Sequence, residues 1–558
     1  MNKNKISRRR FLGQAAGSAV LAGLPGLGST QAQAKYDYQL VVRGATIVDG
    51  TGAPGYTGDI AVRQGRIFAI GKIKEGKSYR TIEANGLVAS PGFIDIHTHT
   101  DTELLKYPRG ESKLRQGVTT EIGGNCGGSP FPSAEGTVAG ERWASLRDFL
   151  SELEKAKIGL NFATFVGQGA VRRNVLQDAN RKPTSDELTK MKQLVATAMR
   201  DGAVGISSGL EYTPSGFAEA DELIELCKAA QTFGGIYATH MRNEDDRLLE
   251  AIQEAIEVAR AASIPLQISH LKAAGRANWS KTDQALALIE EGVRSGVSIH
   301  ADRYPYIAYA TGLSINFPKW ARDGGNDAFV ARLRDMSQRA RMKGETEAKV
   351  RATDGWESLL IAGVRTDANR TLVGRRIAEV ALEKGFDPFH FACDLLVEEN
   401  GSVSTYGFAM DEEGTAKVLA HRRVMIASDG NALSPARTPE KGGLSRPHPR
   451  SYGTFPRVFA EYVRKRKTLT LEQAVQKMTG LVSNKLGWPY RGRLLKDQFA
   501  DIVLFDATRI ADRATFTESE QFPEGIEYVI VNGTPAVEKN SYTESPSGVI
   551  LVGHGRRV

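Results

Sequence analysis

The sequence predicts an α/β protein in which a TIM-like (β/α)8 barrel is inserted into a small β-sandwich formed by both ends of the chain. Three observations predict this fold. Short β-rich runs occur near each end, eight apolar runs alternate with amphipathic stretches between them, and polar residues follow those runs where strands would end. Functional side chains of such barrels lie at the carboxyl ends of the strands. A doubly wound open sheet is the alternative, but no glycine-rich dinucleotide fingerprint follows the first strand.

The composition excludes several classes of protein. At 558 residues, 41% of them hydrophobic, the chain is long enough for two or three domains with large cores. Lys and Arg are mixed with Asp and Glu, so the net charge of +8 forms no basic stripe and we expect no nucleic-acid partner. Three scattered cysteines, Cys126, Cys227 and Cys393, do not make a disulfide framework. We interpret Cys227 and Cys393 as small buried residues.

Residues 1–34 are interpreted as a twin-arginine signal peptide. Arg8 and Arg9 precede a weakly apolar run of Gly and Ala from 15 to 27, and small residues before Lys35 offer a cleavage site. An ordinary secretory signal or a basic disordered arm is the alternative. Elsewhere no stretch is apolar enough to cross a membrane. We therefore expect a periplasmic or secreted protein without a membrane anchor in its mature form, exported in the folded state by the twin-arginine machinery.

The sandwich is predicted from both ends of the mature chain. Residues 35–90 would form its N-terminal half, and residues 485–558 its C-terminal half and a tail. β-rich runs such as 59–62 in the first segment are matched by runs such as 501–505 in the second. Neither set is long enough for a good β core alone, so we expect the two halves to pack as one domain.

Residues 91–484 are predicted to form the barrel. Apolar runs of strand length alternate there with amphipathic stretches such as 186–200 and 246–262. Eight strands with helical crossovers fit the architecture of the barrel. The expected strands are 93–99, 119–123, 161–166, 204–208, 236–239, 266–269, 298–302 and 424–428.

A long insertion separates the seventh strand from the eighth. Residues from about 312 to 420 include charged helical runs at 327–349 and 375–384. Because such a segment would project from the catalytic face, we predict that it forms a lid. A purely structural decoration is the alternative.

The first barrel strand ends in two histidines one residue apart. Strand alternation would place His97 and His99 on one face beside Asp95, with Ile94 and Ile96 packed against helices on the other face. Neutral histidine is a common ligand of divalent metals. A pair of core or surface histidines is the alternative, but Pro91-Gly92 before the strand and the acidic residues beside the pair favour a metal site.

Four further polar residues follow other predicted strands. Cys126 follows the second strand, His240 the fifth, His270 the sixth and Asp429 the eighth. Zinc takes nitrogen, sulfur and oxygen donors of this kind, and a catalytic site keeps one position open for water. Together with the two histidines of the first strand, these residues predict a metal site at the barrel mouth.

The chain resembles the amidohydrolase superfamily of metal-dependent hydrolases and, within it, the N-acyl-D-amino-acid deacylases (the D-aminoacylase family). The stretch 92–101, which contains His97 and His99, is specific only to the superfamily. Asn125-Cys126-Gly127 and the stretch 447–456 indicate the deacylase branch. The matching stretches are 92–101, 123–128, 207–216, 238–243, 268–272, 302–306, 428–430 and 447–456.

The resemblance implies a metal-ligand set. A tightly held zinc would be bound by Cys126, His240 and His270. A second, weaker site would use His97, His99 and Asp429, with the cysteine bridging towards it. Many superfamily members bridge two metals with a carboxylated lysine on the fourth strand, but the stretch 207–211 contains no lysine, which supports the cysteine-bridged branch. Glu211 is expected to lie just outside the ligand set.

The resemblance also implies the reaction. Zinc would activate a water to hydrolyse the amide bond of an N-acyl-D-amino acid, or of a peptide ending in a D-residue, and release a free D-amino acid and a carboxylic acid. Asp429 would act as general base and then as general acid. His240 or Tyr212 would assist the amide oxygen.

The substrate carboxylate is expected to bind Arg450, whose guanidinium fork matches a carboxylate, with help from Lys272 and Tyr304. Two positions depart from the family. Gln168 stands where the family often has a histidine, and Ala310, followed by a threonine, stands where it commonly has a serine that touches the carboxylate. These departures affect the substrate more than the reaction.

Two other functions remain open from the sequence. A hydrolase of cyclic amides, similar to dihydroorotase or hydantoinase, would not need a dedicated clamp for a free carboxylate. A non-catalytic periplasmic binding protein on the same barrel would not need the full ligand set.

Replacement of Arg8 and Arg9 with lysine should leave the precursor in the cytoplasm. Lysine keeps the positive charge but lacks the planar guanidinium group. Cell fractionation followed by immunoblotting measures the distribution of the protein. An unchanged periplasmic yield would exclude the twin-arginine route.

Overall fold

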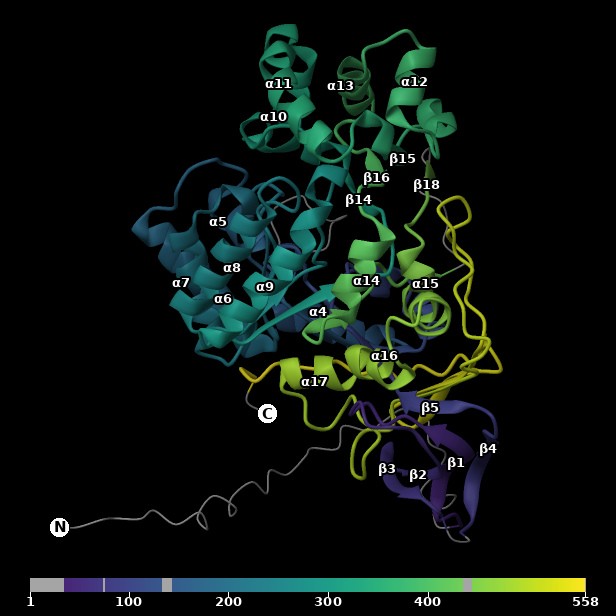
Figure 1. Cartoon of the computed structure of the whole chain (residues 1–558). Helices are drawn as coiled ribbons and strands as arrows, with labels where there is room; N and C mark the ends of the chain where they lie inside the picture. The colour runs from purple at the N-terminus through teal and green to yellow at the C-terminus, as the bar shows by residue number, and fades with distance from the viewer. Residues whose placement is uncertain (1–34, 74–75, 133–142, 435–443, 557–558) are drawn as a thin grey trace, which may run out of the picture.

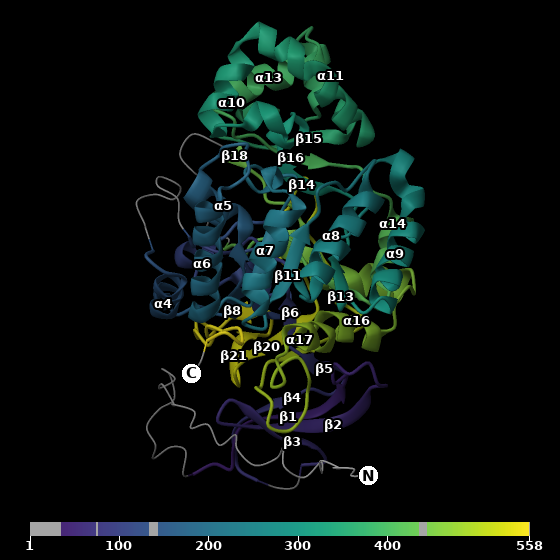
Figure 2. The same cartoon turned by 90° about the vertical axis from the view of Figure 1, so that its left-hand side faces the viewer.

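The computed structural model describes residues 35–73, 76–132, 143–434 and 444–556, so the predicted signal peptide lies outside the described residues. Three parts are stacked along the long axis of the molecule: a β-sandwich, a barrel and a helical insertion (Figure 1 and Figure 2). The predicted fold class, an α/β barrel inserted in a sandwich that both chain ends form, is confirmed. None of the described helices has the length and apolar character needed to cross a membrane.

Eight parallel strands form the barrel. Backbone hydrogen bonds complete the barrel at two junctions. Asp429 N donates to His97 O at 2.8 Å between the first and last strands, and Val204 N donates to Thr164 O at 2.9 Å between the third and fourth. The strands are β6 (Phe93–Asp95), β7 (Val118–Gly123), β8 (Asn161–Thr164), β10 (Gly205–Gly209), β11 (Ile236–His240), β12 (Leu266–Ile268), β13 (Ile299–Arg303) and β17 (Val424–Ile426). The short β9 (Val166–Gly167) follows β8 and pairs with β10.

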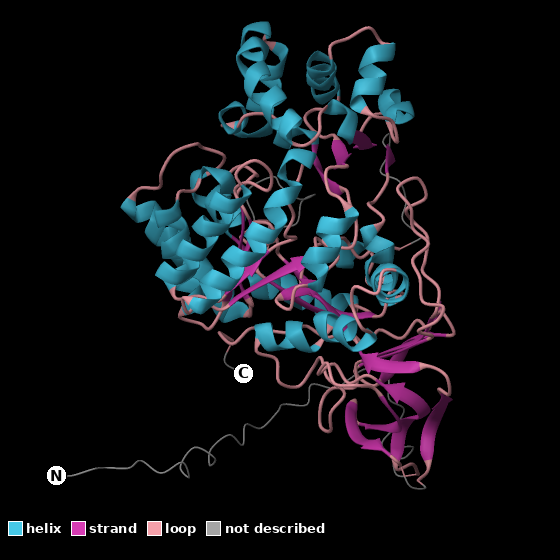
Figure 3. Ribbon diagram, viewed as in Figure 1, coloured by secondary structure: helices cyan, strands magenta, loops and turns pink. Residues whose placement is uncertain are grey.

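Helices surround these strands (Figure 3). Buried apolar residues on one side of each helix pack on the barrel. Thr184 and Glu187 form a capping box at the start of one helix, and Thr470 and Gln473 do so at another. The main barrel helices are α4 (Leu146–Ala156), α5 (Gln168–Leu176), α6 (Ser185–Asp201), α7 (Ala220–Gln231), α8 (Leu248–Ala262), α9 (Thr282–Arg294), α14 (Glu412–Ala420) and α16 (Leu471–Met478).

The side chains of β6 face the opposite way from the sequence prediction. Ile94 and Ile96 lie in one apolar cluster with residues of other barrel strands and with Val482 of α17 (Gly480–Leu486). Phe93 instead packs on the outer helices, with its ring 5.6 Å from that of Phe455. The predicted assignment of faces is wrong because it assumed one regular strand as far as the histidines. β6 instead ends at Asp95, two residues before His97. The backbone bends there, so the histidines can reach the barrel mouth.

The sandwich is built from one continuous network of nine strands. The halves join where β5 pairs antiparallel with β19. Within β19, Ile502 and Leu504 belong to the sandwich core, whereas Val503 and Phe505 belong to the barrel core. One strand therefore supplies apolar side chains to both domains. The strands are β1 (Tyr38–Ile47), β2 (Tyr56–Arg63), β3 (Arg66–Gly71), β4 (Ser78–Glu83), β5 (Val88–Pro91), β19 (Ile502–Phe505), β20 (Ile526–Val531), β21 (Thr534–Glu538) and β22 (Ser541–Tyr542).

The insertion stands over the barrel end opposite the sandwich (Figure 1). It has an apolar core of its own. Asp335 divides the charged run at 327–349, which the sequence predicted as one helical stretch, into two helices. The insertion is shorter than predicted, because α14 within the range 312–420 packs on barrel elements. Its elements are β14 (Tyr309–Gly312), α10 (Gly325–Arg334), α11 (Met336–Ala352), β15 (Leu359–Val364), α12 (Ile377–Glu383), α13 (Pro388–Glu398), β16 (Ser404–Gly407) and β18 (Leu444–Ser445).

Candidate metal centre

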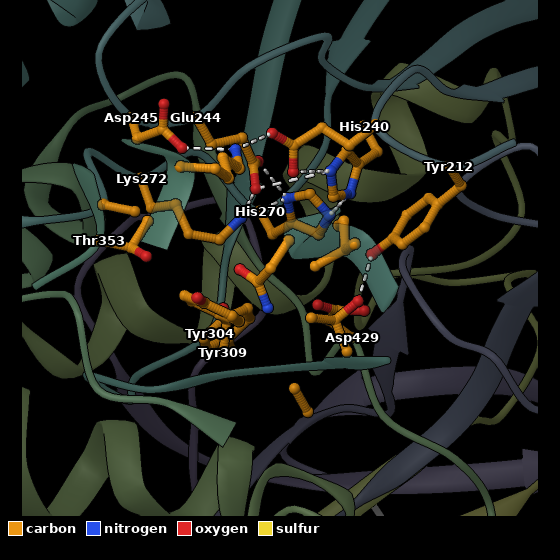
Figure 4. A pocket seen from close by; sticks show the side chains of 17 residues that line it. Tyr212, His240, Glu244, Asp245, His270, Lys272, Tyr304, Tyr309, Thr353 and Asp429 are labelled. Carbon is orange, nitrogen blue, oxygen red and sulfur yellow. Dashed lines mark hydrogen bonds and ion pairs between the residues drawn. The ribbon is translucent and has the colours of Figure 1, made fainter. Parts of the chain in front are cut away.

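A polar pocket lies at the carboxyl ends of the barrel strands, beneath the insertion. Figure 4 shows His240, His270 and Asp429 around it, with Tyr212 and Lys272 nearby. β14 and α11 of the insertion provide further lining residues. All of the predicted metal ligands and substrate-binding residues come together in or beside this pocket.

Cys126, His240 and His270 form the first donor set. Their ligand atoms lie within 4.8 Å of one another. The Cys126 Sγ atom is 3.6 Å from His270 Nε2 and 3.9 Å from His240 Nδ1, and these two nitrogens are 2.9 Å apart. One sulfur and two imidazole nitrogens that converge in this way are typical zinc donors.

His97, His99 and Asp429 form a second donor group next to the same sulfur. His97 Nε2 is 3.4 Å from Cys126 Sγ and 3.4 Å from Asp429 Oδ1. His99 Nε2 is 2.9 Å from the same carboxylate oxygen. Because histidine nitrogens of both groups approach the same sulfur, the thiol of Cys126 can be shared between two metal positions.

Three of these residues have left-handed backbone conformations. The φ angle is 51° at Cys126, 35° at His270 and 53° at Asp429. Such values are uncommon for residues other than glycine and persist where surrounding contacts hold them. Asp302 Oδ1 accepts from the His270 backbone N–H at 2.7 Å. The backbone N–H of Asp429 donates to the carbonyl oxygen of His97 at 2.8 Å. The left-handed turns bring these strand-end side chains into the mouth.

Each of the three buried histidines has a carboxylate on its outer nitrogen. His97 Nδ1 lies 3.1 Å from Asp302 Oδ1. His240 Nε2 lies 3.3 Å from Glu211 Oε2. His270 Nδ1 lies 2.9 Å from Glu244 Oε1. Asp302 and Glu211 are hydrogen-bonded to their histidines, and carboxylates in this position orient a metal-binding imidazole and fix its tautomer. The hydrogen-bond partner of His270 Nδ1 is Lys272 Nζ, at 2.9 Å.

Sequence reasoning missed two of these carboxylates and held the third, Glu211, just outside the ligand set. Asp302 lies in β13, and Glu244 comes four residues after His240. Both positions follow or end a barrel strand, which is the signal that could have identified them. Their contacts with the histidines depend on the closed barrel, which brings separate strands together.

Neighbouring groups hold the cysteine and the aspartate of the pocket in their ionised forms. Burial alone would raise the pKa of the Cys126 thiol, but His97, His240 and His270 hold it well below its ordinary value. Burial would likewise raise the pKa of Asp429, but Arg450, His97 and His99 keep it well below its usual range. A thiolate and a carboxylate that stay ionised beside histidines fit the donor chemistry of zinc.

A further close group does not have the features of a metal site. Glu211, His240 and Glu244 also lie within 4.8 Å of one another. However, Lys349 binds the outer oxygen of Glu211 at 2.8 Å, and Lys272 binds Glu244 at 2.5 Å. These ammonium groups already balance the carboxylates, so this group supports the histidine from outside.

Of the predicted substrate-binding residues, Tyr212, Lys272 and Tyr304 line the pocket, and Arg450 is buried beside Asp429. Arg450 begins α15 (Arg450–Arg457), donates to Asp429 Oδ2 at 2.8 Å and lies over the ring of Tyr304. His448 accepts from the Arg450 backbone N–H at 3.0 Å. The ring of Tyr212 lies 4.8 Å from that of His240. These residues form a wall beside the ionised Asp429.

The two departures from the family pattern have different positions. Thr311 and Ala310 line the pocket, and the Thr311 hydroxyl is 3.3 Å from the Tyr212 hydroxyl. Gln168 is buried, and its amide donates to Glu222 at 2.8 Å. It is not among the residues that line this pocket.

A buried lysine beneath the metal centre joins the first and last strands. Lys113 Nζ lies 2.8 Å from Asp95 Oδ2, 2.7 Å from Glu121 Oε1 and 2.7 Å from the Ser428 hydroxyl. Asp95 also accepts from the Ser428 backbone N–H at 2.9 Å. Asp95 is not among the residues that line the metal pocket, and it supports the segment that carries Asp429.

The chain is similar to known proteins over most of its length. A sequence profile described as "Amidohydrolase family" matches residues 80–537. D-aminoacylase of Alcaligenes xylosoxydans xylosoxydans is 35% identical over 528 residues, which cover 92% of this chain and 97% of that protein. N-acyl-D-aspartate deacylase of the same organism is 32% identical over 537 residues, which cover 94% and 97%.

A solved structure is similar in fold as well as in sequence. N-acyl-D-glutamate deacylase from Bordetella bronchiseptica, complexed with zinc and a phosphonate inhibitor that mimics the tetrahedral intermediate, aligns with a TM-score of 0.79 at 30% identity. The alignment covers 92% of this chain and 100% of that one. The similarity extends through the barrel, the insertion and the sandwich.

Replacement of Cys126 with alanine should abolish tight zinc binding. The thiol is the sulfur donor of both sets, and its neighbours Asn125 and Gly127 offer no substitute. Elemental analysis of purified wild type and variant measures the zinc content. The buried Cys227, remote from the metal centre in the apolar core, provides a matched Cys→Ala control. Full zinc occupancy in the Cys126 variant would contradict this assignment.

Proposed function

Because this chain belongs to the amidohydrolase family, we propose that it is a zinc-dependent N-acyl-D-amino-acid deacylase. It hydrolyses the linear amide bond of an N-acyl-D-amino acid, or of a peptide ending in a D-residue, and releases a D-amino acid and a carboxylic acid. The observation that carries this proposal is the position of Cys126, whose sulfur lies between two histidine pairs beside an ionised Asp429 and an arginine. Relatives at 32–35% identity are named for reactions of this class.

The donor set supports one tight zinc and a second, weaker site. Cys126, His240 and His270 have no competing ion pair on their inward-facing atoms among the described residues, and they would hold the tight ion. His97, His99 and Asp429 would hold the second, where Arg450 binds the same carboxylate. Zinc at this centre would supply a Lewis acid that polarises the amide carbonyl and makes the attacking water more acidic.

Asp429 performs the proton transfers. Its carboxylate stays ionised at neutral pH because Arg450, His97 and His99 outweigh the effect of burial on its pKa. It takes a proton from the attacking water and delivers it to the nitrogen of the leaving amine, acting first as base and then as acid. Tyr212, whose ring lies beside His240, would donate to the amide oxygen.

The carboxylate of the D-amino acid binds beside Asp429, among Arg450, Tyr304 and Lys272. The Tyr304 hydroxyl is buried and has no hydrogen-bond partner among the described residues. A buried hydroxyl without a partner is costly, so a ligand atom beside it is favoured. Arg450 lies over this ring and Lys272 lines the same pocket. These three residues form the carboxylate clamp.

Export to the periplasm by the twin-arginine route completes the proposal. Arg8 and Arg9 followed by a weakly apolar run support it. Folded export suits a protein whose donor set is assembled from separate strands, because the metal can be bound before export. The mature enzyme would then meet its small-molecule substrates outside the cytoplasm.

The proposed reaction is tested with zinc-loaded wild type and Asp429→Asn on an N-acyl-D-amino acid, its L-enantiomer and a hydantoin. We expect wild type to release a free amino acid from the D-substrate only. Asn has a similar shape but cannot accept the proton, so the variant should keep the zinc and lose turnover by a factor of about 10²–10⁴. Mass spectrometry measures the products. Preferential opening of the hydantoin would point instead to a cyclic-amide hydrolase, and no product from any substrate would contradict an enzymatic role.

The carboxylate clamp is tested with Arg450→Ala on an N-acyl-D-amino acid and on its methyl ester. A charge-assisted pair contributes about 1.5–3 kcal/mol, so kcat/KM for the acid should fall about ten- to a hundredfold. The ester lacks the charge, so kcat/KM for the ester should fall much less than kcat/KM for the acid. Arg450→Lys should recover little of the activity, because a point charge does not reproduce the fork. An equal fractional loss on acid and ester would mean that Arg450 does not bind the carboxylate.

A further inference from the structure

Lys349 reaches from the insertion to the barrel mouth. It belongs to α11, and its Nζ lies 2.8 Å from Glu211 Oε1 and 2.5 Å from Asp245 Oδ2. Glu211 follows β10, and Asp245 comes five residues after His240, the last residue of β11. One ammonium group therefore binds two separate loops of the barrel.

The contact continues to a predicted zinc ligand. The second oxygen of Glu211 lies 3.3 Å from Nε2 of His240. Nδ1 of this histidine faces Cys126 and His270, so Nε2 is the outer nitrogen. Glu211 thus binds the insertion with one oxygen and the zinc-ligating ring with the other.

The supports of the other buried histidines come from the barrel alone. Glu244, which contacts His270, is bound by Lys272 at 2.5 Å. Asp302, which contacts His97, accepts from Gln267 at 2.8 Å. Among the described residues, only the carboxylate of His240 is held by a cation of the insertion.

Two more insertion residues bind the same short loop. Lys319 donates to the carbonyl oxygen of Leu210 at 2.7 Å, and Arg322 donates to that of Glu211 at 3.2 Å. Together with Lys349, they fix both the backbone and the side chain at this position. The insertion is therefore attached to the barrel at the residue that orients His240.

We propose that Lys349 is a positioning residue that couples the insertion to zinc through Glu211 and His240. The proposal rests on the assignment of this centre as a zinc site. Tyr309, Thr311 and Lys349 of the insertion line the pocket at the barrel mouth. Any displacement of the insertion from the mouth breaks the contacts of Lys349 with Glu211 and Asp245. Docking of the insertion then strengthens zinc binding, and its displacement weakens it.

The test measures zinc affinity by competition with a chelator and the visible spectrum of the cobalt(II)-substituted protein. An outer carboxylate contributes about 10- to 100-fold to metal affinity, so Glu211→Gln should weaken zinc binding by that factor. Lys349→Met should weaken it by about tenfold, as part of the same effect, and shift the cobalt bands. The double variant Glu211→Gln, Lys349→Met should bind zinc only slightly more weakly than Glu211→Gln alone. Lys349→Arg, which keeps the cation, should restore much of the affinity.

Lys343→Met is the matched control. Lys343 lies on the same helix and binds Asp387 within the insertion at 3.2 Å. It should leave zinc affinity and the cobalt spectrum unchanged. A folded Lys349→Met protein with wild-type affinity and spectrum would overturn the proposal. If that variant does not fold, unchanged zinc affinity in Glu211→Gln would overturn it equally. No readout uses a substrate, so failure to hydrolyse N-acyl-D-amino acids would count against the proposed function alone.

Discussion

The thiol of Cys126 is the contact around which the barrel mouth is arranged. Nitrogen atoms of His97, His240 and His270 approach its sulfur at 3.4–3.9 Å from three other strands. Ionisable groups buried this closely are stable only if each polar atom has a partner. The inward atoms face a common centre suited to a cation, and the outer nitrogens contact carboxylates. The candidate metal ligands and their supports thus follow from one requirement of charge balance.

That requirement also accounts for the irregular ends of the strands. A regular strand would direct alternate side chains to the two faces of the barrel wall. Cys126, His270 and Asp429 leave this pattern through left-handed backbone turns, and β6 ends two residues before His97. The buried Lys113 holds Asp95 and Ser428 together beneath the site, across the junction of the first and last strands. Local regularity is lost where the site is built, and hydrogen bonds between strands compensate.

The remaining parts of the chain act on the mouth from opposite sides. The sandwich shares β19 with the barrel core, so both chain ends are tied to the amino end of the barrel. The insertion contacts the carboxyl end through cationic side chains that bind the loop after β10. Ionic contacts of this kind can break more readily than a shared apolar core. This difference favours a fixed sandwich and a movable insertion.

The sequence by itself determined the strand-and-helix alternation, the sandwich from both ends and the polar residues that terminate the strands. These features are local, because periodicity, turn residues and short motifs are visible in neighbouring residues. Tertiary structure alone decided which face Ile94 occupies, where the insertion ends and which carboxylates support the histidines. Glu244 and Asp302 have no sequence motif that pairs them with His270 and His97. The pairing of these carboxylates with the histidines depends on closure of the barrel. The pairing of Lys349 with Glu211 depends on the position of the insertion, and long-range packing determines both.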